Sequence, residues 1–316
     1  MILAAGKSTR MQSDVPKVLH EVCGRPMLAY VLDEVRAAGA GRLIVVVGHG
    51  RQAVIGRFAG QADVTWVEQA EQRGTGHAAL GCREALRGFA GNVMVIAGDM
   101  PLVRRETIAA LIRTRIEGDD AVSIATTELD DPTGYGRIVR DGAGELMGIV
   151  EHRDCKPQQL AIREVNPSYY CFSAERLFEA LDQVRPSPPK GEVYLTEAIR
   201  VLRESGHSVS AKVRVAAEDA MGVNSRQDLA EVSRAMQKRL QSRHMDAGVT
   251  FVSPENTWIE ADVDIGRDTT IYPFTFIASG ARVGQRCRIG PFAHIGRNDV
   301  IRDESVVSAQ GMEAKP

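Results

Sequence analysis

The chain opens with MILAAGKSTRMQSDVPK (residues 1–17), in which a short apolar run ends abruptly in small and charged residues. The run 1–5 has the composition of a buried strand, and Gly6 begins the turn that follows it. Two widely spaced cations, Arg10 and Lys17, come after the turn. Because ligands of open α/β sheets bind where strands end, this turn is a candidate site for a small anionic ligand.

Residues 1 to about 225 alternate short apolar runs with amphipathic stretches of helical spacing. These stretches end in or before glycine, as helices commonly do. Continuous Val/Ile runs separated by helices predict a mostly parallel, doubly wound sheet. We expect Gly6, Gln69, Gly98 and Asp99 on one rim of this sheet, at the carboxyl ends of its strands. The apolar runs lie at 2–5, 43–48, 64–69, 93–98 and 121–126.

The sequence period changes after a charged helical stretch at 225–246. Eight aliphatic residues then recur at every sixth position, and mostly small residues stand two positions before them. One inward aliphatic side chain in six is typical of hexapeptide repeats, which coil into a parallel β-helix with about three hexads to a coil. The aliphatic residues are Ile259, Ile265, Ile271, Ile277, Val283, Ile289, Ile295 and Ile301.

These patterns predict an α/β domain at 1–224, a linker helix at 225–246 and a short left-handed β-helix at 247–316. Two to three coils are near the minimum for a stable stack of repeats. We therefore expect copies of the chain to associate through the β-helix, as a homotrimer.

Composition excludes several classes of partner. The 316 residues carry 39 Lys+Arg against 41 Asp+Glu, so no excess of positive charge favours nucleic acid or an anionic membrane. The five cysteines are dispersed without a CxxC pair, which suits a reducing compartment and gives no metal or disulfide framework. No apolar run approaches the length of a membrane span, and the start is too short for a signal peptide. We expect a cytoplasmic protein.

Two common phosphate-binding motifs are absent from the opening turn. The earlier glycine of a P-loop is missing, and so is the dinucleotide fingerprint G-x-G-x-x-G. Small residues at Ala4, Ala5 and Gly6 would let a planar base approach the backbone. The fork of Arg10 and the ammonium of Lys17 suit phosphate oxygens, although a single Lys or Arg is more often a solvated surface cation.

The sequence of the whole stretch favours phosphate binding by Arg10 and Lys17 over solvated surface cations. It resembles the signature L-A-A-G-x-[GS]-[ST]-R-M, followed by P-K, of sugar-nucleotide pyrophosphorylases. The longer run MQSDVPKVLHEVCGRPML is similar to bacterial N-acetylglucosamine-1-phosphate uridylyltransferases, the N-terminal half of the bifunctional GlmU family, which serves peptidoglycan synthesis. The similarity continues through VEQAEQRGTGHA, AGDMPLV, LDDPTGYGRIVR, GIVEH and MGVNSRQDL, over about residues 1–245. The hexads resemble the start of that family's second half.

The resemblance implies a Rossmann-like nucleotidyltransferase fold and assigns roles to matching positions. Arg10 and Lys17 would be the catalytic cations, and Asp99 and Asn224 would hold Mg²⁺. One carboxylate and one amide oxygen suit Mg²⁺, which keeps several waters and bridges phosphates; a strand-end Asp alone could equally cap the next helix. The implied substrate-binding positions are Leu3, Ala4, Ala5, Gly6, Lys17, Gln69, Gly74, Thr75, Ala97, Gly98, Asp99, Gly136, Glu151, Asn166 and Asn224.

The matching positions divide between the two substrates. Gln69 would read uracil through its amide, with Gly74 close to the base, whereas Glu151 and Asn166 would face the sugar. The family usually reads Asn-Thr-Gly where this chain has Asn166, Pro167 and Ser168. Because proline lacks a backbone donor and favours extended geometry in the residue before it, the identity of the sugar stays open.

The sequence thus predicts a UDP-N-acetylglucosamine diphosphorylase, which converts UTP and N-acetylglucosamine 1-phosphate to UDP-N-acetylglucosamine and pyrophosphate. A histidine base is not required, because the phosphate oxygen is already anionic and catalysis reduces to alignment and charge neutralisation. Two alternatives remain: the same chemistry with another hexose 1-phosphate or dTTP, and a non-catalytic regulatory subunit. We expect no acetyltransferase activity, because the family's acetyltransferase histidine and coenzyme A contacts have no counterpart in this sequence.

Overall fold

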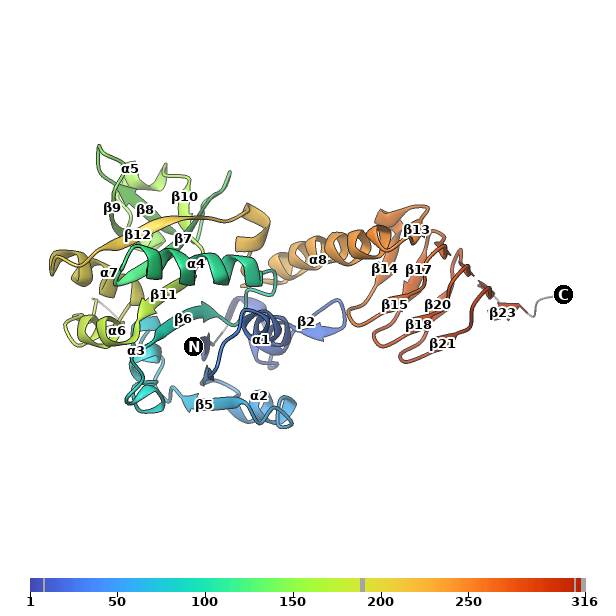
Figure 1. Ribbon diagram of the computed structural model, residues 1–316, viewed down its shortest axis with the longest axis horizontal. Coiled ribbons are helices and arrows are strands. Elements are labelled where there is room, and N and C mark those ends of the chain that lie inside the picture. Colours follow the sequence, from blue (N-terminus) through green and yellow to red (C-terminus); the bar gives the residue numbers. More distant parts are fainter. Residues whose placement is uncertain (8, 188–190, 310, 314–316) are drawn as a thin grey trace. The chain divides into compact units, whose positions relative to one another are not determined.

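The computed structural model (Figure 1) describes residues 1–7, 9–187, 191–309 and 311–313. The chain forms two compact units, Met1–Leu19 with Met27–Ser225 and His20–Pro26 with Arg226–Pro316. The sequence pattern predicted 20–26 as part of the first domain. The structure groups this hairpin with the second unit, where the amide of Ala261 donates to the carbonyl of Cys23 at 2.8 Å.

A ten-stranded mixed sheet forms the centre of the first unit. Its first four strands are parallel, with Ile2 opposite both Val45 and Ile96, and the fifth is antiparallel to its neighbours. The expected α/β fold is confirmed, with a mixed rather than mostly parallel outer half. The order is β5 (Val64–Glu68), β4 (Leu43–Val47), β1 (Ile2–Ala4), β6 (Asn92–Ala97), β11 (Tyr170–Ser173), β7 (Val122–Glu128), β10 (Glu164–Asn166), β8 (Gly136–Arg140) and β9 (Leu146–Val150), with β12 (Val209–Arg214) also paired to β7.

Helices cover both faces of this sheet, as a doubly wound fold requires. Alternate residues of β4 enter different cores: Val45 packs with α1 (Met27–Ala37), α2 (Arg51–Arg57) and α4 (Arg105–Glu117), whereas Val46 packs with the helices of the other face. Those helices are α3 (Thr75–Leu80), α6 (Ala174–Leu181) and α7 (Leu195–Glu204), and the short α5 (Pro157–Leu160) follows β9 in the chain.

The sequence of α7 shows why it forms and where it packs. Leu195, Ala198, Ile199 and Leu202 are buried at positions i, i+3, i+4 and i+7, which place one apolar stripe on one side of the helix. Each fully buried aliphatic side chain contributes about 1.5–3 kcal/mol relative to exposure. The stripe joins the core on that face of the sheet and thereby fixes the residues at the start of α7.

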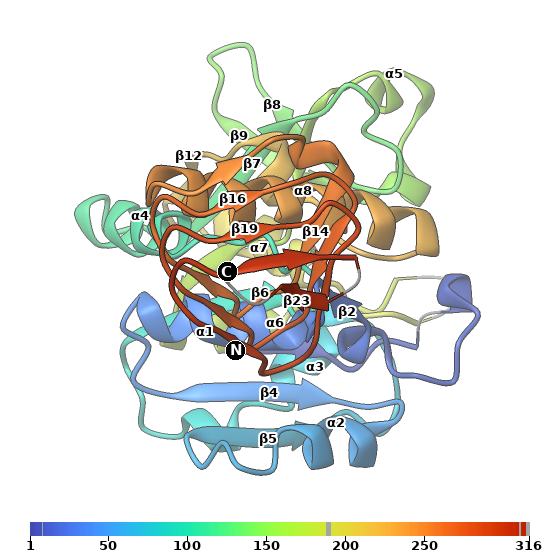
Figure 2. The same ribbon diagram turned by 90° about the vertical axis from the view of Figure 1, so that its right-hand side faces the viewer.

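The second unit contains α8 (Arg226–Asp246), the hairpin of β2 (Glu21–Val22) with β3 (Arg25–Pro26), and a parallel β-helix (Figures 1 and 2). Ile259 pairs with Ile277 and Ile277 with Ile295, so each coil takes 18 residues, or three hexads. The three walls are β13 (Thr250–Phe251), β16 (Thr270–Ile271), β19 (Arg288–Ile289) and β22 (Val306–Ser308); β14 (Thr257–Ile259), β17 (Thr275–Ile277) and β20 (His294–Ile295); and β15 (Asp264–Ile265), β18 (Arg282–Val283) and β21 (Val300–Ile301). All eight predicted aliphatic residues are buried, which confirms the hexapeptide β-helix.

The corners of the β-helix recur with the same six-residue period. The same position of each hexad has a positive φ, and all but one of the residues at this position carry a side chain, which makes the conformation costly for them. The shared ladder hydrogen bonds of the coils hold these corners in place. They are Asp262, Asp268, Phe274, Gly280, Arg286, Phe292, Asn298 and Glu304.

Two glutamines of α8 cover the open edge of β14, the first strand of its β-helix wall. The amide oxygen of Gln237 accepts from the backbone N–H of Ile259 at 3.0 Å, and its nitrogen donates to the carbonyl of the same residue. Gln241 donates to the carbonyls of Pro254 and Thr257, each at 2.9 Å. Side-chain amides thus take the place of a neighbouring strand. At the far end, β23 (Gly311–Glu313) pairs antiparallel with β22.

Within the described ranges, no helix is both long and apolar enough to cross a bilayer.

Candidate active site

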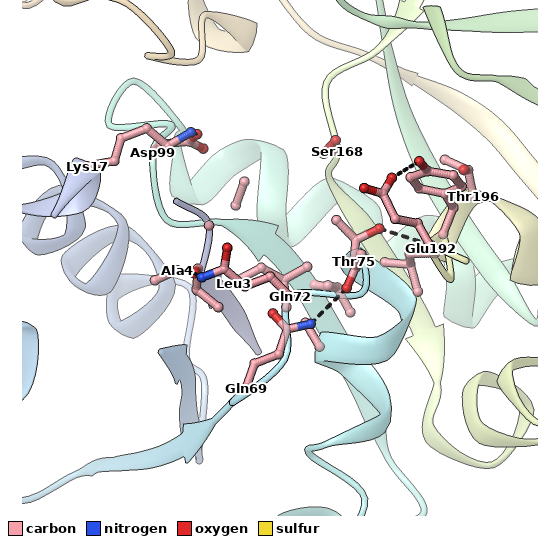
Figure 3. Close-up of a pocket in the computed structure, with 18 of the residues that line it drawn as sticks. Leu3, Ala4, Lys17, Gln69, Gln72, Thr75, Asp99, Ser168, Glu192 and Thr196 are labelled. Carbon is pink, nitrogen blue, oxygen red and sulfur yellow. Dashed lines mark hydrogen bonds and ion pairs between the residues drawn. The ribbon is translucent and has the colours of Figure 1, made fainter. Parts of the chain in front are cut away.

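A cavity of about 460 Å³ opens in the first unit where β1 and β6 end. Figure 3 shows Lys17 and Asp99 on one side of it and Glu192 and Thr196 on the other, with Leu3 and the glutamines between. Most of the residues that the sequence assigned to a site line this one cavity: Leu3, Ala4, Ala5, Gly6, Lys17, Gln69, Gly74, Thr75, Ala97, Asp99 and Glu151. No histidine is among the described residues that line it.

The turn after β1 is held from two sides. Gln72 donates from Nε2 to the carbonyl of Ala5 at 2.9 Å, and its Oε1 accepts from the backbone N–H of Lys7 at 3.2 Å. On the other side, a Cβ added to Gly48 would lie 2.7 Å from the same Ala5 carbonyl, so only glycine allows this approach. Gln72 was not predicted from the sequence, although it stands in the same motif as Gln69, three residues later.

Gln69 is buried, and its orientation is fixed by its neighbours. Its Nε2 donates to the carbonyl of Gly74 at 3.0 Å and lies 3.0 Å from Nδ1 of His77. When His77 carries its proton on Nε2, both N–H groups of Gln69 are engaged, and its amide oxygen is the group left for a ligand. Gly74 has φ +95°, and a Cβ there would lie 2.6 Å from the carbonyl of Val193. Glycine is therefore required at this position.

A three-residue cluster stands at one side of the cavity. Lys17 begins the short 3₁₀ turn Lys17–Leu19, and its Nζ donates to Oδ2 of Asp99 and, at 3.1 Å, to Oδ1 of Asn224. Only 16% of the Lys17 side chain and 15% of the Asp99 side chain are exposed. The backbone N–H of Val223 donates to the Asp99 carbonyl at 3.0 Å, which holds the segment carrying Asn224 against the end of β6.

The donor atoms of this cluster fit a divalent cation. Asp99 and Asn224 already share one cation, the Lys17 ammonium, so their oxygens converge on a common point. Carboxylate and amide oxygens are the hard ligands that Mg²⁺ prefers. Among the described residues, no group of three or more His, Cys, Asp or Glu side chains could hold a metal ion. A cation here would therefore take its remaining ligands from water and phosphate.

The opposite side of the cavity is built by the end of β9 and the start of α7. Thr196 donates from Oγ1 to Oε1 of Glu151 at 2.8 Å. Burial raises the pKa of Glu151, and this hydrogen bond opposes the shift only in part. Tyr194 donates its hydroxyl to Glu192, which also accepts from Arg153 at 2.7 Å. Carboxylates and hydroxyls in this arrangement can bind the hydroxyl groups of a sugar.

Most of this side was not predicted from the sequence. Its lining also includes Ser168, Tyr170, Glu192, Tyr194, Leu195 and Thr196. The only signal in the sequence was a run of polar and aromatic residues, GEVYLTE, directly before a strongly amphipathic helix. Nothing in that run points to Glu151, about forty residues earlier, which it meets only in the folded chain.

Two of the predicted substrate-binding residues lie behind the cavity wall rather than on it. Gly136 and Asn166 face each other across β8 and β10. Asn166 donates from Nδ2 to the hydroxyl of Tyr170 at 2.6 Å and accepts the backbone N–H of Ser168 at 3.0 Å. Its side chain is therefore engaged within the fold, and it reaches the cavity through Ser168 and Tyr170, which do line it.

Three other predicted residues are also outside the described lining of the cavity. Gly98 packs behind it, where an added Cβ would lie 3.2 Å from that of Ala4. Asn224 is connected to the cavity by its hydrogen bond with Lys17, which does line it. Arg10 is exposed in the 3₁₀ turn Thr9–Met11. Its neighbour Ser8 lies outside the described residues.

Known proteins match both units of the chain. The MobA-like NTP transferase domain matches residues 1–207, and the bacterial transferase hexapeptide (six repeats) matches 262–297. Proteins named "Bifunctional protein GlmU" are 42% identical to the chain in Clostridium botulinum (strain Eklund 17B / Type B) over 304 residues, in Heliobacterium modesticaldum over 315 and in Pelotomaculum thermopropionicum over 342.

These alignments cover 96%, 98% and 96% of the chain, which in turn spans 66%, 68% and 74% of the three relatives. The cavity therefore lies in the NTP transferase part of the sequence, and the second unit carries the hexapeptide repeats. The chain belongs to the MobA-like NTP transferases and, through both of its units, to the GlmU family.

Proposed function

We propose that this chain transfers the uridylyl group of UTP to N-acetylglucosamine 1-phosphate, giving UDP-N-acetylglucosamine and pyrophosphate. One observation carries the proposal: groups suited to a base, to phosphates and to a sugar line a single cavity (Figure 3). Gln69 stands at the base end, Lys17 beside the phosphates and Glu151 at the sugar end. This order is the order of the parts in the product.

The chemistry follows from these positions. An anionic oxygen of the sugar phosphate attacks the α-phosphorus of UTP and forms the new P–O bond, while the bond between the α- and β-phosphates breaks and pyrophosphate leaves. No proton has to be removed from the nucleophile. The work of the protein is alignment and neutralisation of the charge on the leaving group. Lys17 supplies positive charge from the cavity wall, and Arg10 would do so from the turn after β1.

We assign Asp99 and Asn224 as the protein ligands of Mg²⁺. Their oxygens converge on one cation, and the scarcity of other acidic ligands among the described residues suits a metal bound largely by water and phosphate. When bound, the metal would neutralise phosphate charge. The five cysteines are all free, which supports a reducing, cytoplasmic setting for the reaction.

For the acceptor we propose N-acetylglucosamine 1-phosphate. Glu151, with Thr196 beside it, is placed to accept hydrogen bonds from sugar hydroxyls. Asn166 acts through Ser168 and Tyr170, whose groups line the wall where an acetamido substituent would lie. Another hexose 1-phosphate remains the alternative, because Pro167 and Ser168 differ from the family's usual residues.

We further propose that the chain forms a homotrimer through its β-helix. Phe274 and Phe292 are 56% and 64% exposed and stack at a centroid distance of 5.0 Å, and Phe276 stacks on His294 at 5.2 Å. Exposed aromatic patches of this kind commonly mark protein interfaces. Sedimentation of the wild type against Phe274→Ser/Phe292→Ser tests this: we expect a trimer that the substitutions dissociate, and a monomeric wild type would contradict it.

The decisive experiment measures pyrophosphate release by the purified chain with Mg²⁺, UTP or dTTP, and a panel of sugar 1-phosphates. We expect turnover with UTP and N-acetylglucosamine 1-phosphate. Turnover restricted to glucose 1-phosphate or to dTTP would overturn the substrate assignment. If no pair gives turnover while UTP still binds, the regulatory-subunit alternative is supported instead.

A further inference from the structure

The Lys17 ammonium stands at the point where the oxygens of Asp99 and Asn224 converge. Its Nζ donates to both side chains and forms an ion pair with Asp99. The pair is largely withdrawn from solvent, so its charges are weakly screened. The charge of the Asp99 carboxylate is thus already balanced by the Lys17 ammonium.

A metal ion and this ammonium cannot both use that point. The Lys17 ammonium already donates to Oδ2 of Asp99 and to Oδ1 of Asn224, and a divalent cation placed between these two side chains would lie against the positive charge of Nζ. Like charges at contact distance in a partly buried site repel strongly. Metal binding therefore requires the ammonium to leave.

A phosphate ligand would give the Lys17 ammonium an alternative partner. Lys17 lines the cavity, and its charge sits at the end of a flexible four-carbon stem that can turn toward an anion. The phosphates of a nucleotide would supply new partners for the ammonium and release Asp99 and Asn224 at the same time.

We propose that the Lys17 ammonium competes with a divalent cation for Asp99 and Asn224. It occupies the metal site until the phosphates of a ligand bind it, and Asp99 and Asn224 are then free to bind the metal. The metal then enters with the nucleotide and not before it. The inference rests on the proposed function for the identity of the phosphate ligand. Its first step, competition between Lys17 and a divalent cation, concerns the protein alone.

The test is Mn²⁺ binding to the nucleotide-free protein, followed by the paramagnetic resonance signal of free Mn²⁺. The wild type is compared with Lys17→Met, with Lys17→Gln, which keeps a donor for Asp99 without its charge, and with Lys17→Arg, which keeps the charge. Because a charge-assisted hydrogen bond is lost as a competitor, we expect both neutral variants to bind Mn²⁺ about tenfold or more tightly than the wild type. Lys17→Arg should bind as weakly as the wild type.

Two controls make the result specific. Lys212→Met removes an exposed lysine of β12 and should leave Mn²⁺ affinity unchanged. Adding Asp99→Asn to Lys17→Met should cancel the gain. The proposal is overturned if neither neutral variant binds more tightly, or if Lys212→Met gains as much as they do. These outcomes are independent of pyrophosphate release, so a failure here leaves the proposed reaction standing, and the reverse.

Discussion

The two units of this protein encode their structures in different ways. In the β-helix, each buried aliphatic residue stands six positions from the next and pairs with residues one coil away, as Ile259 does with Ile277. In the first unit, Lys17 contacts Asp99, which is 82 positions away in the sequence, and Asn224, which is 207 positions away. The repeats can therefore be predicted from the sequence, whereas the cavity forms only when distant strands and helices pack together.

This difference predicts that the units fail separately. A substitution at the cavity should remove chemistry and leave the β-helix folded, because polar residues at its rim contribute little to the apolar cores. A substitution inside a coil should cost stability and leave the chemistry of each folded molecule intact.

Asp99→Asn should have the largest effect. It removes the charge that balances Lys17 and that would hold the metal, and we expect kcat to fall by about 10²–10³-fold, as for loss of one well-placed electrostatic group. Pyrophosphate release measures this loss. Asp130→Asn, at a fully exposed position paired with Arg163, is the matched control and should leave kcat within about twofold of the wild type. Equal rates for Asp99→Asn and the wild type would refute the assignment.

Ile277→Ala should be the reciprocal case. Ile277 is fully buried in the middle coil, and its truncation should lower the free energy of unfolding of the second unit by about 2–5 kcal/mol. Denaturant unfolding followed by Trp258 fluorescence in a Trp66→Phe background measures it, with Ile277→Val as a milder control that costs about 1 kcal/mol. A drop in kcat per folded molecule, under conditions where the protein remains assembled, would show that the units are not separable.

Gln237→Ala tests whether α8 replaces a missing strand. Removing the amide leaves the backbone N–H and C=O of Ile259 without their partner, at a cost of about 1–3 kcal/mol for a buried polar group. The midpoint of unfolding of the second unit should fall. The exposed Lys238→Ala, one position along the same helix, serves as the control and should change the midpoint little. Equal midpoints for the two variants would contradict this role of Gln237.

Glu151→Gln should have the smallest effect, a change in how the free energy of unfolding depends on pH. Burial raises the pKa of Glu151, so the folded state binds the proton more tightly than the unfolded state does. The stability that this group contributes is therefore fully present below its ordinary pKa of 4.5 and is lost as pH rises through the raised value. Glu151→Gln should gain stability relative to the wild type as pH rises through this window. A difference that shrinks with rising pH would contradict the sign.

Sequence reasoning reached further in some parts of the molecule than in others. The opening strand, its turn and the hexads were recognised because each is a local pattern or a regular repeat. Glu192 and Thr196 were not predicted because their place in the cavity depends on how α7 packs against the sheet, which no spacing in the sequence expresses. Gln72 was not predicted because its role depends on contacts with Ala5 and Lys7, which are more than sixty positions earlier in the chain. Gly136 and Asn166 were matched by motif, yet they support the wall of the cavity instead of lining it.

The hairpin at 20–26 makes the same point within a single motif. It stands in the run that resembles the uridylyltransferases, between the turn that carries Lys17 and helix α1. Its backbone nevertheless pairs with the β-helix unit, through Cys23 and Ala261. Adjacency in the sequence therefore did not decide which core this segment joins.

By itself, the sequence determined the two architectures, the family and the chemical types of the residues at the cavity, because hydrophobic period and motif spelling are properties of neighbouring positions. Only the tertiary structure decided which of those residues meet. It placed the Lys17 ammonium between Asp99 and Asn224. It also placed Asn166 behind the cavity wall, where its side chain donates to Tyr170. The physical reason is that ion pairs and hydrogen bonds depend on distance in space, which the packing of the whole sheet and its helices sets.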